Sequence, residues 1–422
     1  MTPAGKTISE KILSAKSNTD ARAGDIVVCN VDLVLGTDAS GPMTIDYFAR
    51  MGGERLFDAS RVAFSLDHYA PPSSPKTAAF HAQVRAFAQR YGGQVFEVGE
   101  GISHQIIAER GRALPGDLVI GADSHTVTCG ALNLFATGVG SSDLAAAMIT
   151  GTIWLRVPET IKVVLDGKRP HGLTAKDVAL AMIATLGAEG ANYRTLEFHG
   201  NGVNEFTLEE RFVFANLAVE SSAKAAIFAN DSATTDYLAP RTSARGTAVA
   251  SDGDAVFASE LVLRLDELAA SVAIPHSPND VVPIDTVSNI PVHMVFLGTC
   301  TGGRVVDFHE ALAVLERGGS RVAPGVQLVV TPASREVYLR LIDDGTIAKL
   351  AAMGAIVTTP GCGACCGTSG AIPGDGMNVV STANRNFKAR MGNATASIYL
   401  ASPAACAAAA VTGHLTDPRE VG

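Results

Sequence analysis

Short apolar runs alternate along the chain with longer stretches of helical periodicity. The apolar runs are rich in Val, Ile, Leu and Phe and end at polar, Gly or Pro positions, which predicts β-strands. We expect strands at Asp25–Val31, Arg61–Leu66, Gln94–Val98, Leu118–Gly121, Thr160–Leu165, Val292–Leu297, Val326–Thr331, Ala355–Thr358, Asn378–Val380 and Ser397–Leu400. We expect helices between them at Thr77–Tyr91, Ser142–Trp154, Ala175–Leu186, Ala255–Ser271, Asp307–Arg317 and Arg335–Met353. This alternation predicts an α/β fold with mostly parallel sheets.

Two positions divide this pattern into three segments. The stretch His276–Pro291 is polar, contains three Pro and has no helical stripe, so it is the best candidate for a linker. A second division is expected near Pro158, where the strand–helix pattern starts again. We therefore expect three α/β/α domains over residues 1–157, 158–283 and 284–422.

Reactive side chains follow directly after several of the predicted strands. They are carboxylates, imidazoles, thiols and a guanidinium group, at Asp67 and His68, at Asp123, Ser124 and His125, at Cys300, at Cys362 and Cys365, and at Asn384 and Arg385. Ligands of open α/β sheets bind outside the carboxyl ends of the strands. A single such position is compatible with a polar turn. Five of them together predict a functional site.

Three cysteines are candidates for a metal site. Cys362 and Cys365 form a C-x-x-C motif, which zinc sites, dithiol redox sites and iron–sulfur clusters share. A structural zinc site needs four ligands and the chain has no second C-x-x-C, while a dithiol site leaves Cys300 without a role. Three thiolates suit a [4Fe–4S] cluster with one iron that has no Cys ligand. Such an iron can act as a Lewis acid on a substrate hydroxyl group.

The other four of the seven cysteines are expected to have structural roles. Cys29, Cys129 and Cys406 are interpreted as small buried apolar residues. Cys366 follows Cys365 directly, so its thiol is expected to point away from the cluster.

The acid–base candidates combine carboxylates with imidazoles. Asp67 and His68, and likewise Asp123 and His125, are close enough in sequence for the carboxylate to prepare the imidazole for proton transfer. His104 is a further candidate. The amide of Asn216 and the carboxylate of Glu220 share one face if their segment is helical. The guanidinium groups of Arg385 and Arg390 suit a di- or tricarboxylate.

Composition and charge narrow the range of partners. The 422 residues include 33 Lys and Arg against 42 Asp and Glu, and the net charge of −9 argues against nucleic-acid binding. The apolar runs stay well below the roughly 20 residues that a membrane-spanning helix needs. The first eight residues lack the charged and apolar regions of a signal peptide, so we expect a cytoplasmic protein with no membrane partner.

Several motifs together resemble the aconitase superfamily, and most of all the large subunits of its 3-isopropylmalate dehydratase and homoaconitase branches. The similarity extends over nearly the whole chain. The motifs are Gly121–Thr126, Gly138–Asp143, Leu297–Thr301, Pro360–Cys365 and Asn384–Phe387.

The resemblance implies three α/β/α domains around a [4Fe–4S] cluster bound by Cys300, Cys362 and Cys365, with one iron not ligated by Cys. It implies reversible dehydration of a 2-hydroxy di- or tricarboxylic acid, with isomerisation of 3-isopropylmalate and 2-isopropylmalate as the first expectation. The implied catalytic residues are Asp67, His68, His104, Asp123, His125 and Glu220. The implied substrate-binding residues are Ser124, Asn216, Asn384, Arg385 and Arg390.

The resemblance also implies a partner. In the superfamily the base that takes the substrate proton is a Ser of a fourth, swivelling domain, and nothing after Arg390 resembles that domain. In split members of the superfamily a separate small subunit carries it. We therefore expect this chain to need such a subunit and to have little activity alone.

The chain departs from the family pattern at a few positions near these motifs. Gly302 stands where Asn usually follows Cys-Thr, Ser222 and Ala389 stand where Gly is usual, and Val127 and Cys129 are also unusual. None of these changes removes a ligand or a charged catalytic residue. They leave open another hydroxy-acid substrate, of the homoaconitate, 2,3-dimethylmalate or citramalate/maleate type. A non-enzymatic iron or redox sensor that uses the same three thiols is a further alternative.

Overall fold

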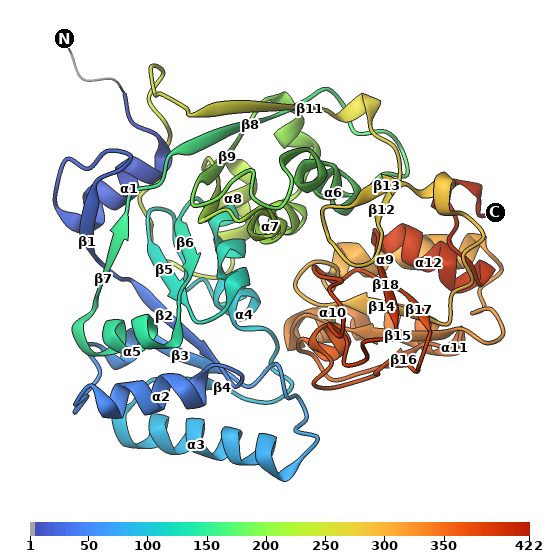
Figure 1. Cartoon of the computed structure of the whole chain (residues 1–422), viewed down its shortest axis with the longest axis horizontal. Coiled ribbons are helices and arrows are strands. Elements are labelled where there is room, and N and C mark those ends of the chain that lie inside the picture. The colour runs from blue at the N-terminus through green and yellow to red at the C-terminus, as the bar shows by residue number, and fades with distance from the viewer. Residues whose placement is uncertain (1–4) are drawn as a thin grey trace.

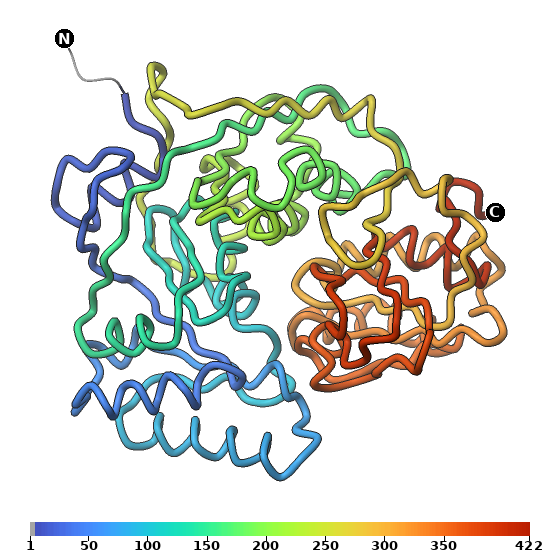
Figure 2. Tube along the Cα trace, in the orientation of Figure 1, coloured from blue at the N-terminus to red at the C-terminus, as the bar shows by residue number. Residues whose placement is uncertain are grey.

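The computed structural model describes residues 5–422, so the beginning of the N-terminal segment considered above lies outside the described residues. The chain forms a mixed α/β structure with three larger, mostly parallel sheets and one two-stranded ribbon (Figure 1). This confirms the predicted fold class. The part of the chain from β14 (Met294–Gly298) to α12 (Pro403–Thr412) lies beside the earlier part, as the tube view also shows (Figure 2).

The first sheet is parallel throughout and has the strand order β4-β3-β2-β5-β6. Its strands are β2 (Leu33–Thr37), β3 (Val62–Ser65), β4 (Gln94–Phe96), β5 (Leu118–Gly121) and β6 (Phe135–Gly138). The helices of this part are α1 (Ile8–Ser17), α2 (Gly41–Arg50), α3 (Pro75–Tyr91), α4 (Ser103–Glu109) and α5 (Ser141–Thr150). An antiparallel ribbon of β1 (Ile26–Asn30) and β7 (Thr152–Arg156) accompanies them.

The second sheet is also parallel and has the order β10-β9-β8-β11. Its strands are β8 (Thr160–Asp166), β9 (Thr195–His199), β10 (Ala225–Phe228) and β11 (Ser259–Arg264). The helices that connect them are α6 (Ala175–Leu186), α7 (Leu208–Leu217) and α8 (Ser232–Leu238).

The third sheet has seven strands in the order β13-β12-β18-β17-β14-β15-β16, and its two strands β12 and β13 are antiparallel to their neighbours. The strands other than β14 are β12 (Ser271–Ala273), β13 (Val281–Pro283), β15 (Gln327–Thr331), β16 (Ile356–Val357), β17 (Asn378–Ser381) and β18 (Ser397–Leu400). Its helices besides α12 are α9 (Val305–Arg317), α10 (Arg335–Asp343) and α11 (Thr346–Ala352).

Three predicted helices differ from the structure. The helix expected at Ala255–Ser271 is wrong, because this segment forms β11, whose backbone pairs with the open edge of β8. The helix expected at Ser142–Trp154 ends at Thr150, where Gly151 has φ +73°, and the following residues form β7. The helix expected at Arg335–Met353 is two helices, because Gly345 between them has φ +81°.

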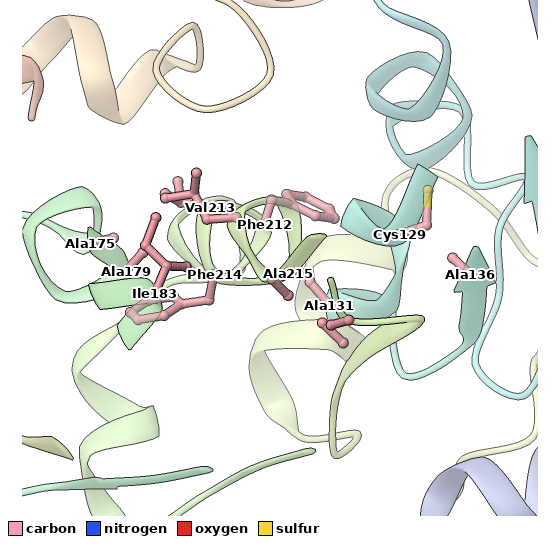
Figure 3. Packing of buried hydrophobic residues seen from close by; sticks show 14 of the residues in the cluster. Cys129, Ala131, Ala136, Ala175, Ala179, Ile183, Phe212, Val213, Phe214 and Ala215 are labelled. Atoms are coloured by element: carbon pink, nitrogen blue, oxygen red, sulfur yellow. The ribbon is translucent and has the colours of Figure 1, made fainter. Parts of the chain in front are cut away.

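Buried side chains hold the layers of the second sheet against the site segments. In Figure 3, Phe212, Val213, Phe214 and Ala215 of α7 lie between residues of α6, such as Ile183, and the 3₁₀ segment Ser124–Leu132. These residues belong to one continuous hydrophobic cluster, whose burial is the main favourable contribution to folding. Helix α7 is therefore fixed between α6 and the segment that carries Ser124 and His125.

No helix of the described residues is long and apolar enough to cross a membrane.

Two of the departures from the family pattern keep a backbone conformation that favours glycine. Ala389 has φ +62° and Ser222 has φ +64°, both in the left-handed region. An L-residue with a side chain is strained there by about 1–2 kcal/mol, whereas glycine is not. At both positions this chain therefore carries a side chain on a turn whose backbone suits glycine.

We expect the substitution Ala389→Gly to stabilise the protein. Relief of the left-handed strain exceeds the extra unfolded-state entropy of glycine, about 0.4–1 kcal/mol, so the free energy of unfolding should rise by about 0.5–1 kcal/mol. Denaturant unfolding of the purified chain measures this change. The matched control is Ala351→Gly at an exposed position in α11, where glycine should destabilise by about 1 kcal/mol. Equal destabilisation by both substitutions would contradict the expectation.

Candidate active site

The side chains that follow the strands do meet in space. Asp67 and His68 follow β3, and Asp123 and His125 follow β5, its near neighbour in the first sheet. The second sheet adds Asn216 at the end of α7 and Glu220 in the 3₁₀ turn Ala218–Ser221. The third sheet adds the groups that follow β14, β16 and β17, namely Cys300, Cys362, Cys365, Asn384, Arg385 and Arg390.

The first acid–base pair is fixed by several hydrogen bonds. The Nδ1 atom of His68 lies 2.7 Å from Oδ1 of Asp67, whose other oxygen accepts a hydrogen bond from the backbone N–H of Ser103 at 2.9 Å. The Nε2 atom of His68 faces Oδ2 of Asp123 at 3.6 Å. Burial alone would lower the pKa of His68, but the charges of Cys362 and Asp67 outweigh it and hold this pKa well above its usual value. Asp67 engages Nδ1 of His68, so Nε2 is the ring atom that can exchange a proton with a bound molecule.

The second acid–base group forms a chain of charges that ends on an arginine. Nε2 of His125 lies 3.0 Å from Oε1 of Glu220, and Nε of Arg385 lies 2.8 Å from the same oxygen. Burial would raise the pKa values of Asp123 and Glu220. The hydrogen bond and charge of His125 lower both, and Arg385 also lowers that of Glu220. Both carboxylates are therefore ionised over the whole physiological pH range.

Amide side chains connect the thiols of Cys300 and Cys365. Nδ2 of Asn216 donates to Sγ of Cys300 at 3.0 Å, and Nδ2 of Asn384 lies 3.4 Å from the same sulfur. Oδ1 of Asn384 lies 3.6 Å from Sγ of Cys365. On the other side, Nη2 of Arg390 donates to Sγ of Cys365 at 3.5 Å. Amide and guanidinium donors of this kind stabilise metal-bound thiolates.

The thiol of Cys362 lies beside the first acid–base pair. Ligand atoms of Asp67, His68 and Cys362 are all within 4.8 Å of one another, and the backbone N–H of Cys362 donates to the carbonyl of Asp67 at 2.9 Å. Burial raises the pKa of Cys300 to about 12 and holds that of Cys362 well above its usual value. A metal that takes the place of these thiol protons would stabilise the thiolates and so offset the free energy that their ionisation costs in a buried position.

Two buried groups aimed at this region lack partners among the described residues. They are both ring nitrogens of His104, which lies on α4, and Nε of Arg390. Burial lowers the pKa of His104 to about 3, so its imidazole is neutral. Buried polar atoms without partners are rare unless a ligand, ion or water satisfies them. Together with three neighbouring thiols, they fit a site that holds a metal group and a polar substrate.

The hydroxyl of Ser124, another predicted site residue, makes a long contact of 3.4 Å to Nδ1 of His125. The predictions for the remaining cysteines are consistent with the structure. Cys29, Cys129 and Cys406 are fully buried, and Sγ of Cys366 lies 2.8 Å from the hydroxyl of Thr368.

The structure adds a residue that sequence reasoning missed. Asp38 follows β2 and is fully buried, and its carboxylate accepts hydrogen bonds from the backbone of His68 and Tyr69 at 2.9 Å. It also lies 2.9 Å from Nε2 of His81. Asp38 thus orients the segment that carries the first acid–base pair. If a strand had been predicted at Leu33–Thr37, Asp38 would have been found as a polar residue that directly follows a strand, like the other site residues.

Close packing explains the departure at Gly302. An ideal Cβ atom built on Gly302 would lie 2.3 Å from Cβ of Thr382, far inside van der Waals contact. Any side chain at position 302 would therefore displace the backbone that leads to Asn384.

The comparisons with known proteins agree with this arrangement. The model of the aconitase family (aconitate hydratase) matches residues 10–413. The chain therefore belongs to the aconitase family, a family of hydro-lyases. This confirms the resemblance inferred from the motifs.

The more particular similarity is to one branch of this family. The chain is 44% identical to 3-isopropylmalate dehydratase large subunit 1 of Methanopyrus kandleri, over 98% of this chain and 99% of the relative. It is 45% identical to large subunit 2 of Archaeoglobus fulgidus, over 99% of each chain. It is 43% identical to large subunit 1 of Thermotoga maritima, over 98% of this chain and 99% of the relative.

A solved structure is similar in fold. The holo form of aconitase X from Thermococcus kodakaraensis superposes with a TM-score of 0.53, at 12% identity, over 92% of this chain and 91% of that one. At this identity the similarity concerns the fold alone.

Proposed function

We propose that this chain is the large subunit of a [4Fe–4S]-dependent hydro-lyase that interconverts 3-isopropylmalate and 2-isopropylmalate. The contact network carries the proposal, because Asn384 contacts both Cys300 and Cys365 while Glu220 joins His125 to Arg385. Thiols, proton-handling groups and a carboxylate-binding cation thereby form one site. The names of the relatives support this substrate over the alternatives of the homoaconitate or dimethylmalate type.

We assign the cluster to Cys300, Cys362 and Cys365. Their sulfur atoms, the surrounding donors and the partnerless His104 suit a group with three thiolate ligands and one open iron. When bound, the cluster supplies a Lewis acid that makes the substrate hydroxyl a better leaving group.

The side chains of this chain supply the remaining functions. His68 donates the proton that the departing hydroxyl requires, because its Nδ1 is engaged by Asp67 and its Nε2 faces the site. Arg385 and Arg390 bind the substrate carboxylates and stabilise the negative charge that develops beside them. Glu220 orients Arg385 and His125, while His104 and Ser124 bind substrate or water as neutral groups.

The partner we propose is a small subunit that carries the fourth, swivelling domain with the base for the substrate proton. The relatives are named large subunits, and the chain matches about their whole length, which supports a division of the enzyme into two chains. The proposed location is the cytoplasm, where thiols stay reduced.

Anaerobic assay of the purified chain tests this function, with reconstituted cluster and with or without a co-expressed small subunit of a related dehydratase. We expect hydration and dehydration of isopropylmalate only with both chains present. Full activity of the chain alone would contradict the need for a partner. Activity on homoaconitate, 2,3-dimethylmalate or citramalate but not on isopropylmalate would contradict the substrate. A cluster that binds without supporting any hydratase activity would favour the iron or redox sensor.

A further inference from the structure

Lys176 is a buried cation in direct contact with the backbone of the substrate-binding segment. It lies at the start of α6, a helix that connects strands of the second sheet, and is 1% exposed. Its Nζ atom donates to the carbonyl oxygens of Thr382 at 3.1 Å and Ala383 at 2.8 Å. These are the two residues directly before Asn384 and Arg385.

No carboxylate of the described residues lies within ion-pairing distance of this ammonium group, since Lys176 occurs in none of the salt bridges of residues 5–422. Burial of a charge without a counter-ion is costly, and buried charges are normally paired or fully hydrogen-bonded. The hydrogen-bond partners of this ammonium group among the described residues are these two carbonyl oxygens, which it attracts more strongly than a neutral side chain would. It therefore restrains the backbone of residues 382–383.

The backbone at residues 382–383 is also hydrogen-bonded within the third sheet, where the N–H of Thr382 donates to the carbonyl of Phe296 at 3.0 Å. The hydroxyl of Thr301 donates to the carbonyl of Thr382 at 2.7 Å, and the hydroxyl of Thr382 accepts from the backbone N–H of Gly298 at 2.9 Å. These contacts come from the third sheet itself. Lys176 is the contact that residues 382–383 receive from the second sheet. Together with Asn216, whose Oδ1 accepts from Nδ2 of Asn384 at 3.3 Å, it ties the segment to α6 and α7.

The segment beyond these carbonyls carries groups on which the site depends. Asn384 bridges Cys300 and Cys365, and Arg385 pairs with Glu220 of the second sheet. The contact of Arg385 with Glu220 crosses between the two parts of the molecule that Lys176 also connects. A shift of residues 382–383 would move both side chains together.

The base of Lys176 is itself rigid. Thr174 and Asp177 form a reciprocal cap at the start of α6, and Asp177 Oδ1 accepts from the backbone N–H of Ser271 at 3.4 Å. Helix α6 packs on α7, as Figure 3 shows for Ala175, Ala179 and Ile183. The ammonium group is therefore held from a fixed helix end, which gives it the precision that a positioning residue needs.

We infer that Lys176 is a positioning residue: its ammonium group holds the carbonyls of residues 382 and 383 and thereby sets Asn384 and Arg385 in the active site. The consequence for the segment stands on the contacts alone. The consequence for catalysis rests on the proposed function.

Hydrogen exchange of the full chain tests the structural part with Lys176→Met, and with Lys168→Met, an exposed lysine, as the matched control. We expect amide exchange over residues 383–390 to be about tenfold faster in Lys176→Met, with exchange in β15 unchanged. Lys168→Met should equal the wild type. Unchanged exchange over residues 383–390, or an equal increase throughout the protein, would overturn the inference.

If Lys176→Met does not fold, Lys176→Gln decides the question, because its amide keeps a donor without the charge. Its exchange over residues 383–390 should be intermediate and localised, and wild-type exchange would overturn the inference.

Kinetics of the two-chain enzyme test the catalytic part. We expect Lys176→Met to raise KM for the hydroxy acid about tenfold, with visible cluster absorbance retained per chain. Lys176→Arg, which keeps charge and donors, should recover part of the loss. Faster exchange with unchanged KM and kcat would overturn the role in positioning for catalysis. If the wild-type enzyme has no hydratase activity, the proposed function fails, whereas the exchange result still decides the structural part.

Discussion

The substitution Cys300→Ser is expected to remove the iron–sulfur absorbance of the reconstituted protein and at least about a hundredfold of its hydratase activity. Serine offers a hard hydroxyl group with a shorter reach in place of a soft thiolate, and iron–sulfur clusters select thiolates. The amide groups of Asn216 and Asn384, which point at the sulfur of Cys300, would then face an oxygen that does not bind the cluster. Iron content, visible absorbance and activity of the same sample measure the effect.

The chain provides a matched control in Cys366→Ser. Cys366 is next to Cys365 in sequence and half-buried, but its thiol contacts the hydroxyl of Thr368. This variant should keep wild-type iron content and absorbance. Full iron content in Cys300→Ser, or loss of the cluster in Cys366→Ser, would show that the assignment of ligands is wrong.

The substitution Glu220→Gln is expected to lower kcat/KM of the two-chain enzyme about a hundredfold, since disruption of a buried charge pair costs about 3 kcal/mol. The carboxylate of Glu220 lies within 3.0 Å of both His125 and Arg385, and its side chain is 3% exposed. Glutamine preserves the size of the side chain and removes the charge. Arg385 would lose its ion-pair partner, and if it binds a substrate carboxylate as proposed, KM should rise as well as kcat fall.

Steady-state kinetics with Glu189→Gln as control separates this effect from a general loss of charge. Glu189 is exposed, and its replacement should leave both constants unchanged. If Glu220→Gln keeps the wild-type kcat/KM, Glu220 has no role in catalysis. The cluster absorbance of the variant should remain, because Glu220 contacts none of the three thiols in the described residues.

The strand-end rule explains why so much of the site could be predicted from the sequence. The first acid–base pair, the second one and the thiols each follow an apolar run that forms a strand, so position alone marked them. Asp38 escaped because the expected strand Asp25–Val31 ends just before Asp32, and no second strand was predicted at Leu33–Thr37. In the structure Asp32 accepts from the backbone of Leu118 between two separate strands.

Long-range contacts account for the rest. Lys176, like Lys76 in α3, reads from the sequence as an ordinary lysine near a helix start, and only the packing of α6 brings its ammonium group to residues 382–383, more than 200 positions away. The segment of β11 was mistaken for a helix because its strand character comes from pairing with β8. Local pattern does not contain such information, since tertiary pairing overrides intrinsic preference.

The order of the site residues along the chain has a consequence for how the protein matures. Both acid–base groups and Glu220 belong to the first two sheets, whereas every thiol assigned to iron and Arg385 belong to the third. At a synthesis rate of about 5–20 residues per second, the ribosome delivers Arg385 many seconds after Glu220. The proton-handling groups are therefore present on the growing chain before Cys365 completes the thiol set. In the proposed enzyme, insertion of the cluster can be completed only after synthesis has passed Cys365, so these groups always precede the cluster.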